Sequence, residues 1–173
     1  MPKIIANLSQ DELIDSFFDN SQPNQEAPRA VIIMGGVGSG KTTMRKNEFA
    51  SGYVQIDGSD IFSKIVKEES ADDLDQYLPT IDEIGQQIMH RAVKERRNLA
   101  IEHIGDDASE MESIVDKLNE IGYQVDLRFV DCDTTEAYLR HLKATDSDYH
   151  YLSCYFTKDL HTKWILNAFQ NNF

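Results

Sequence analysis

Residues Ala30 to Thr43 read A-V-I-I-M-G-G-V-G-S-G-K-T-T, and this stretch decides the fold. The run from Ala30 to Met34 is apolar without polar alternation, which is typical of a strand buried on both faces of a parallel sheet. Directly after it, Gly35 to Thr42 fits the phosphate-loop pattern G-x-x-x-x-G-K-[ST]. The stretch therefore predicts a buried strand, a glycine-rich loop and a helix, in that order.

The glycines of this loop allow tight turns that point backbone N–H groups into one concavity, which suits the β-phosphate of a nucleotide. The N-terminal end of the following helix adds a partial positive charge. We predict that Lys41 reaches the β- and γ-phosphates and that the Thr42 hydroxyl holds Mg²⁺. A flexible turn is the alternative, but the strand and helix on either side favour an ATP-binding loop. Its predicted nucleotide-binding residues are Gly35, Gly36, Val37, Gly38, Ser39, Gly40, Lys41, Thr42 and Thr43.

The whole chain has 173 residues and a formal net charge of −13. This length favours a single domain, residues 1–173. The charge disfavours a nucleic-acid partner, because a phosphate backbone would be repelled. No apolar run approaches the roughly 20 residues of a membrane span, and the start does not resemble a signal peptide, so we expect a cytoplasmic protein. Cys132 and Cys154 form no metal-binding pattern and no evident disulfide framework.

Strand and helix patterns alternate along the chain. A helix over residues 9–20 begins with the capping box Ser9 to Glu12, and a polar linker, 21–28, follows it. The core, 30–143, carries further short strands near 53–56, 99–101 and 125–130, and a second capping box, Thr80 to Glu83, predicts a helix start. Residues 144–173 hold a lid region and a C-terminal helix. This alternation predicts a three-layer α/β fold of the P-loop kinase type, with helices flanking a mainly parallel sheet of four or five strands.

Three carboxylates follow predicted strands. Asp57 and Asp60 come after residues 53–56, and Glu102 comes after residues 99–101. Because the carboxyl ends of parallel strands line the ligand crevice, all three are expected beside the phosphates. We predict that Asp57 shares the metal with Thr42 and that Asp60 is the base for an acceptor hydroxyl, while a helix cap at Ser59 or Asp60 is the alternative.

The chain resembles the zeta-toxin group of P-loop kinases from about Ala30 to Lys143. The resemblance lies in G-G-V-G-S-G-K-T-T, Y-V-Q-I-D-G-S-D-I-F, N-L-A-I-E, G-Y-Q-V-D-L-R-F-V and A-Y-L-R. It implies ATP-dependent phosphorylation of a UDP-activated amino sugar, with Asp60 as the base and Glu102 near the substrate. It also raises the question of an antitoxin-like protein partner.

The sequence departs from that family at the substrate side. His103 and Ile104 replace the usual Gly and Thr, Gln86 stands where a glutamate is expected, and residues 144–156 contain no arginine. Arg140 is the nearest candidate for the arginine that faces the transferred phosphate. His103 is more often structural than catalytic at such a position. Two other functions therefore stay open: a kinase for another hydroxyl acceptor, such as a nucleoside or a chloramphenicol-like antibiotic, and a nucleotide-binding interaction protein without catalysis.

Overall fold

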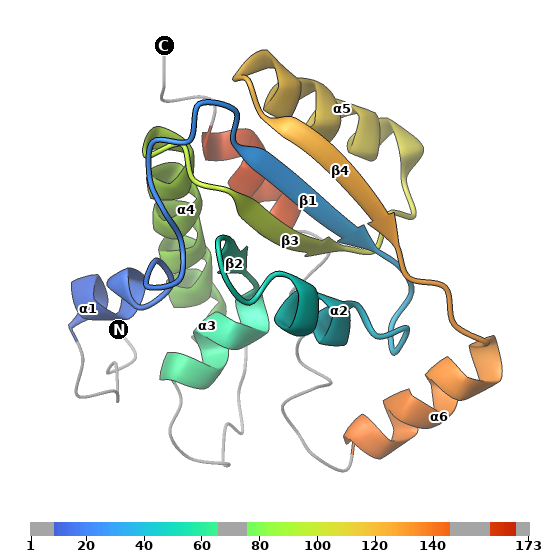
Figure 1. Ribbon diagram of the computed structural model, residues 1–173. Coiled ribbons are helices and arrows are strands. Elements are labelled where there is room, and N and C mark those ends of the chain that lie inside the picture. Colours follow the sequence, from blue (N-terminus) through green and yellow to red (C-terminus); the bar gives the residue numbers. More distant parts are fainter. Residues whose placement is uncertain (1–8, 66–75, 146–159, 169–173) are drawn as a thin grey trace.

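The computed structural model of the chain describes residues 9–65, 76–145 and 160–168. Within them lies a four-stranded parallel sheet with the order β2-β3-β1-β4 (Figure 1). The predicted mainly parallel α/β fold is thereby confirmed. The strands and helices are α1 (Gln10–Asp15), β1 (Arg29–Met34), α2 (Lys41–Glu48), β2 (Val54–Ile56), α3 (Gly58–Ile65), α4 (Leu78–Lys94), β3 (Leu99–His103), α5 (Ala108–Glu120), β4 (Gln124–Phe129) and α6 (Thr134–Thr145), followed by a C-terminal helix at residues 160–168.

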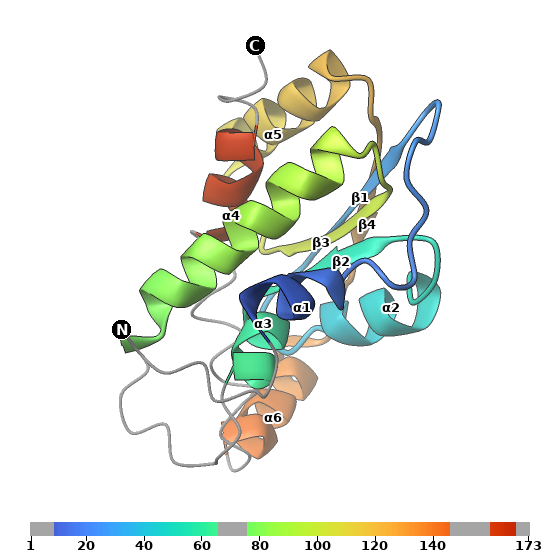
Figure 2. The same ribbon diagram turned by 90° about the vertical axis from the view of Figure 1, so that its left-hand side faces the viewer.

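The central strand β1 is buried on both faces, as its uninterrupted apolar run predicts. Ala30 and Ile32 belong to the larger core cluster, which includes side chains from α4, α5 and the C-terminal helix. Val31 and Ile33 point the other way and pack with Phe49, next to α2. Figure 2 shows α4, α5 and the C-terminal helix on one side of the sheet and α2 on the other. The sheet therefore forms the middle of three layers, and β1 carries the glycine-rich loop at its carboxyl end.

Two helix starts differ in how well the sequence predicts them. Ser9 and Glu12 form the expected capping box, although the helix ends at Asp15 and continues only as turns to Asn20. The predicted capping box at Thr80 to Glu83 is wrong, because α4 already begins at Leu78 with no side-chain cap. Pro79 explains the earlier start, since its fixed φ and missing N–H suit the first helical turn.

The C-terminal helix is held against α4 by its tryptophan. Trp164 is fully buried, and its Nε1–H donates to Asp82 Oδ1 at 2.9 Å. The indole lies directly over Gly85, where an added Cβ would approach the ring to 2.2 Å. Only glycine therefore allows this close approach between the two helices.

We expect Gly85→Ala to displace Trp164 and to lower the melting temperature by about 5–10 °C, since overpacking of this kind commonly costs 1–3 kcal/mol. Trp164 is the single tryptophan of the chain, so its fluorescence reports on this helix alone. The emission should shift to the red. Gly36→Ala is the control, because a Cβ there meets nothing within 4 Å. Unchanged emission in Gly85→Ala would contradict the packing described.

Candidate nucleotide-binding and phosphoryl-transfer site

The glycine-rich loop joins β1 to α2 and surrounds the Lys41 ammonium. Lys41 Nζ donates to Gly35 O at 2.8 Å and to Gly36 O at 2.9 Å. The Ser39 hydroxyl is buried and has no hydrogen-bond partner among the residues that the structure describes. A phosphate would offer both groups charged acceptor oxygens, which bind an ammonium more strongly than neutral carbonyls do. The loop therefore has the residues and the shape that a phosphate group needs.

Helix α6 lies against the outer side of this loop. Gly38 has a φ of 75°, and a Cβ there would come within 2.5 Å of Ala137 O in α6. Arg140, on the same helix, has its Nη1 at 3.5 Å from Ser39 O and is also paired with Glu136. Arg140, which was predicted to face the transferred phosphate, thus lies beside the glycine-rich loop. Two of the residues that were predicted to bind the nucleotide, Val37 and Thr43, are exposed.

A buried arginine on α2 links the loop to the carboxylates. Arg45 is 0% exposed, and its Nε donates to Glu102 Oε1 at 2.7 Å. Its Nη1 lies 2.8 Å from Asp60 Oδ2, and its Nη2 lies 4.0 Å from Asp57 Oδ2. The other oxygen of Glu102 accepts the Thr42 hydroxyl at 3.0 Å. One guanidinium therefore brings the three predicted carboxylates together around the start of α2.

Burial and charge act in opposite directions on these groups. Burial, together with the charge of Asp57, raises the pKa of Glu102 above its usual value, although Arg45 and Thr42 favour its ionised form. Burial would also raise the pKa of Asp57, but the charge of Arg45, the His161 ring and bonds from Ser59 keep that pKa below its usual value. The three carboxylates raise the pKa of Arg45, against the effect of burial. Arg45 is thus a permanent cation within the cluster.

Asp57 and Asp60 have different roles in the local structure. Asp57 Oδ1 accepts the N–H groups of Ser59 at 2.8 Å and Asp60 at 3.3 Å, so Asp57 is the residue that caps α3. The alternative of a cap at Ser59 or Asp60 is therefore wrong. The Thr42 hydroxyl is bonded to Glu102 and not to Asp57.

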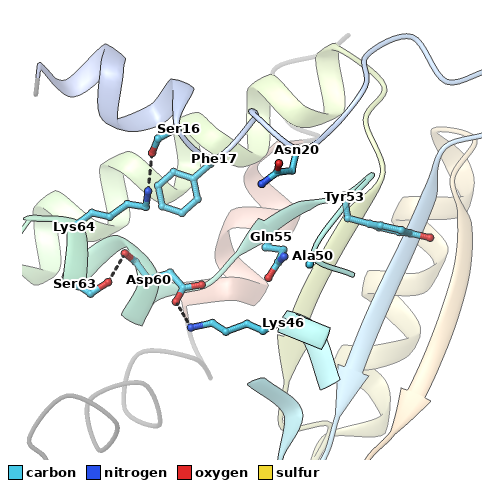
Figure 3. Close-up of a pocket in the computed structure, with 10 residues that line it drawn as sticks. All are labelled: Ser16, Phe17, Asn20, Lys46, Ala50, Tyr53, Gln55, Asp60, Ser63 and Lys64. Atoms are coloured by element: carbon cyan, nitrogen blue, oxygen red, sulfur yellow. Dashed lines mark hydrogen bonds and ion pairs between the residues drawn. The ribbon is translucent and has the colours of Figure 1, made fainter. Parts of the chain in front are cut away.

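The Asp60 carboxylate faces a pocket between α2, α3 and the turns that follow α1 (Figure 3). Lys46 Nζ lies 3.2 Å from Asp60 Oδ1, and Lys64 lines the same pocket, where its ammonium lies over the Phe17 ring. The pocket has a volume of about 240 Å³. Asp60 is thus linked through Arg45 to Glu102, the residue that accepts the Thr42 hydroxyl, and it is also paired with Lys46 of α2.

Mg²⁺ prefers hard oxygen ligands and is usually bound by one or two protein oxygens together with phosphates. Thr42 Oγ1 and Glu102 Oε2 are such oxygens, 3.0 Å apart at the start of α2. Three carboxylates against two cations, Arg45 and Lys46, leave a net negative charge that also favours a cation nearby. The described residues contain no group of three or more His, Cys, Asp or Glu that would hold a metal without such phosphates. The residues therefore fit a phosphate-bound Mg²⁺.

Two positions that depart from the zeta-toxin pattern have structural contacts. His103 is 0% exposed; its Nδ1 accepts the Gly105 N–H at 2.9 Å, and its Nε2 lies 2.9 Å from Thr162 Oγ1. Gln86 donates to Asp82 at 2.9 Å.

Arg45 is one residue of the site that the sequence reasoning missed. The available signal was its spacing, because Arg45 lies three residues after Thr42 and four after Lys41, on the helix face that must point to the sheet. A charge on a buried face requires a partner of opposite charge, and the carboxylates at the strand ends are the evident partners.

A central parallel strand, a glycine-rich loop around a lysine and a hydroxyl–carboxylate pair together define a nucleotide-binding, kinase-like P-loop protein. The family model for zeta toxins matches residues 14–162. The chain therefore belongs to the zeta-toxin family, as the sequence resemblance indicated. No curated protein sequence matches it.

Solved structures with low sequence identity share this fold. A chain from the PezAT chromosomal toxin–antitoxin system of Streptococcus pneumoniae has 20% identity and a TM-score of 0.63, over 85% of this chain and 64% of that one. A chain from the Pnkp1/Rnl/Hen1 RNA repair complex has 17% identity and a TM-score of 0.55, over 87% of this chain and 47% of that one. The protein thus spans less than two thirds of either relative. Among its described residues, no helix is long and apolar enough to cross a membrane.

Proposed function

We propose that the protein is an ATP-dependent phosphotransferase that uses Mg²⁺ and transfers the γ-phosphate to a hydroxyl of a small molecule. The observation that carries this proposal is the pair formed by Thr42 and Glu102, 3.0 Å apart, next to a loop that encloses Lys41. Phosphoryl transfer requires mainly positioning and charge neutralisation, and these residues supply both.

Each residue then has one role. Residues 35–43 bind the triphosphate, with Lys41 donating to its β- and γ-oxygens. Thr42 and Glu102 are better placed than Asp57 to hold Mg²⁺, because Asp57 is occupied by the cap of α3. Arg140 contributes a positive charge from α6. Asp60 accepts the proton of the acceptor hydroxyl. The hydroxyl oxygen then bonds to the γ-phosphorus, and ADP leaves.

For the acceptor we propose a UDP-activated amino sugar, as membership of the zeta-toxin family suggests. A nucleoside or a chloramphenicol-like alcohol is the alternative, because Gln86 and Ile104 differ from the usual family residues. A protein partner of the antitoxin kind is proposed only by analogy with the PezAT system.

A transfer screen tests the function. The protein is incubated with Mg²⁺ and ATP labelled at the γ-phosphate, together with UDP-amino sugars, nucleosides or small alcohols, and labelled product is detected by chromatography. We expect one acceptor class to be labelled. Binding of ATP without labelling of any acceptor would instead favour the nucleotide-binding interaction protein.

We expect Asp60→Asn to reduce transfer by about 10²-fold, the usual scale for loss of a general base. The structure adds a complication, because the change also removes an ionic partner of Arg45. Gln55→Met is therefore the matched control, since Gln55 Oε1 accepts from the same Arg45 Nη1 at 3.0 Å. Transfer should stay within a few fold in Gln55→Met. If both variants lose transfer equally, Asp60 acts only through Arg45 and is not the base.

A further inference from the structure

The C-terminal helix reaches the candidate site through a buried histidine. His161 is 0% exposed, and both of its ring nitrogens have partners. Nδ1 lies 2.8 Å from Glu102 O, and Nε2 accepts the Gly58 N–H at 3.1 Å. These partners assign the proton to Nδ1, which donates to the carbonyl.

The two backbone groups that His161 joins belong to different elements. Glu102 lies in β3 and presents its side chain to Thr42 and Arg45. Gly58 is the first residue of α3, between the capping Asp57 and the candidate base Asp60. One imidazole ring therefore spans the gap between the metal-side carboxylate and the acceptor-side carboxylates.

The helix that carries His161 is itself well anchored. Thr162 Oγ1 lies 2.9 Å from His103 Nε2, at the next residue of β3. Lys163 pairs with Asp82, and Trp164 lies over Gly85, both in α4. The position of the imidazole is thus fixed from β3 and from α4, which is what a rigid support for neighbouring functional groups requires.

We propose that His161 is a positioning residue that sets the separation between Glu102 and the start of α3, and so aligns the Mg²⁺ side of the site with the acceptor side. This inference rests on the proposed phosphotransferase function. It assigns a functional role to a helix that the loop and carboxylate motifs do not include. Without the imidazole, the Gly58 N–H and the Glu102 carbonyl lose their buried partner and the two elements can shift.

Three variants test this role. His161→Phe keeps an aromatic ring but removes both hydrogen bonds, whereas His161→Gln retains one donor and one acceptor. Trp164→Phe is the control, because it weakens the same helix by losing the bond to Asp82 but keeps an aromatic ring beside the His161 imidazole and leaves both hydrogen bonds of His161 in place. Each variant is measured for melting temperature, affinity for Mg²⁺-ATP, kcat and KM of transfer, and hydrogen exchange of the Gly58 amide.

We expect His161→Phe to reduce kcat by about 30-fold or more, in keeping with the large cost of a small misplacement, while affinity for Mg²⁺-ATP changes by less than about threefold. His161→Gln should recover most of kcat. Trp164→Phe should keep kcat despite a lower melting temperature. If kcat falls in His161→Phe and Trp164→Phe in proportion to lost stability, or stays unchanged in His161→Phe, the proposal is overturned.

Hydrogen exchange separates this proposal from the proposed function. Even if no acceptor is labelled by the wild type, the Gly58 amide should exchange faster in His161→Phe than in Trp164→Phe or His161→Gln. Protection of Gly58 that does not depend on His161 would overturn the structural link itself, whatever the enzyme's activity. Faster exchange in His161→Phe alone would support the link and leave only the transfer reaction in question.

Discussion

Lys41→Ala is expected to remove nearly all phosphoryl transfer, with a reduction of about 10²- to 10³-fold. Lys41 is the loop residue whose ammonium can follow the charge that develops on the phosphates, and loss of one such preorganised donor typically costs about 3–4 kcal/mol in the transition state. The side chain now donates to Gly35 O and Gly36 O, so the ammonium already lies within the loop.

The assay compares transfer rates for the wild type, Lys41→Ala and Lys117→Ala. Lys117 is the control, because it pairs with Glu120 on the exposed surface of α5 and lies outside the candidate site. Its loss should change neither transfer nor stability appreciably. Equal transfer by Lys41→Ala and wild type would remove the nucleotide loop from the proposed mechanism, and with it the main support for a kinase.

The sequence predicts those parts of the fold and site that depend on local patterns. The apolar run before Gly35 identifies β1 as a central strand, and the glycine spacing identifies the loop that encloses Lys41. Glu102 was expected beside the phosphates, because it comes directly after the predicted strand 99–101. In the structure it lies near the end of β3, and its side chain accepts the Thr42 hydroxyl. These features can be predicted from neighbouring residues alone, together with the rule that the carboxyl ends of parallel strands lie at the same edge of the sheet.

Features that depend on contacts between distant segments were not predicted. Asp57, rather than Ser59 or Asp60, caps α3. The cap falls there because β2 ends at Ile56 and α3 begins at Gly58, and the sequence pattern did not fix these two bounds. His161 has no metal-ligand spacing in the sequence, yet its ring lies against the backbone carbonyl of Glu102, 59 residues away. The pairing of a C-terminal helix with a strand end leaves no periodic signal in either segment.

Arg45→Met is expected to destabilise the protein by about 3–5 kcal/mol, the usual cost of removing one partner from a buried ion pair. Arg45 is 0% exposed and is the guanidinium that lies among Asp57, Asp60 and Glu102. Typical domains have a total stability of only about 5–15 kcal/mol. The variant should therefore unfold at a much lower urea concentration and should lose transfer, because Glu102 and Asp60 are no longer held together.

The pH dependence of this loss distinguishes a charge effect from a packing effect. The pKa of Asp57 is lowered in the folded protein, so its ionised form contributes stability above the ordinary carboxyl pKa, and this contribution is lost as the pH falls through the lowered value. The stability difference between wild type and Arg45→Met should thus be largest near pH 7 and shrink below about pH 4.

Arg91→Met is the matched control. Arg91 also pairs with two carboxylates, of Asp15 and Glu95, but it is partly exposed, so its loss should cost less than about 1 kcal/mol. A loss in Arg45→Met that is as small as in Arg91→Met, or that does not change with pH, would show that the buried guanidinium does not hold the site together by its charge.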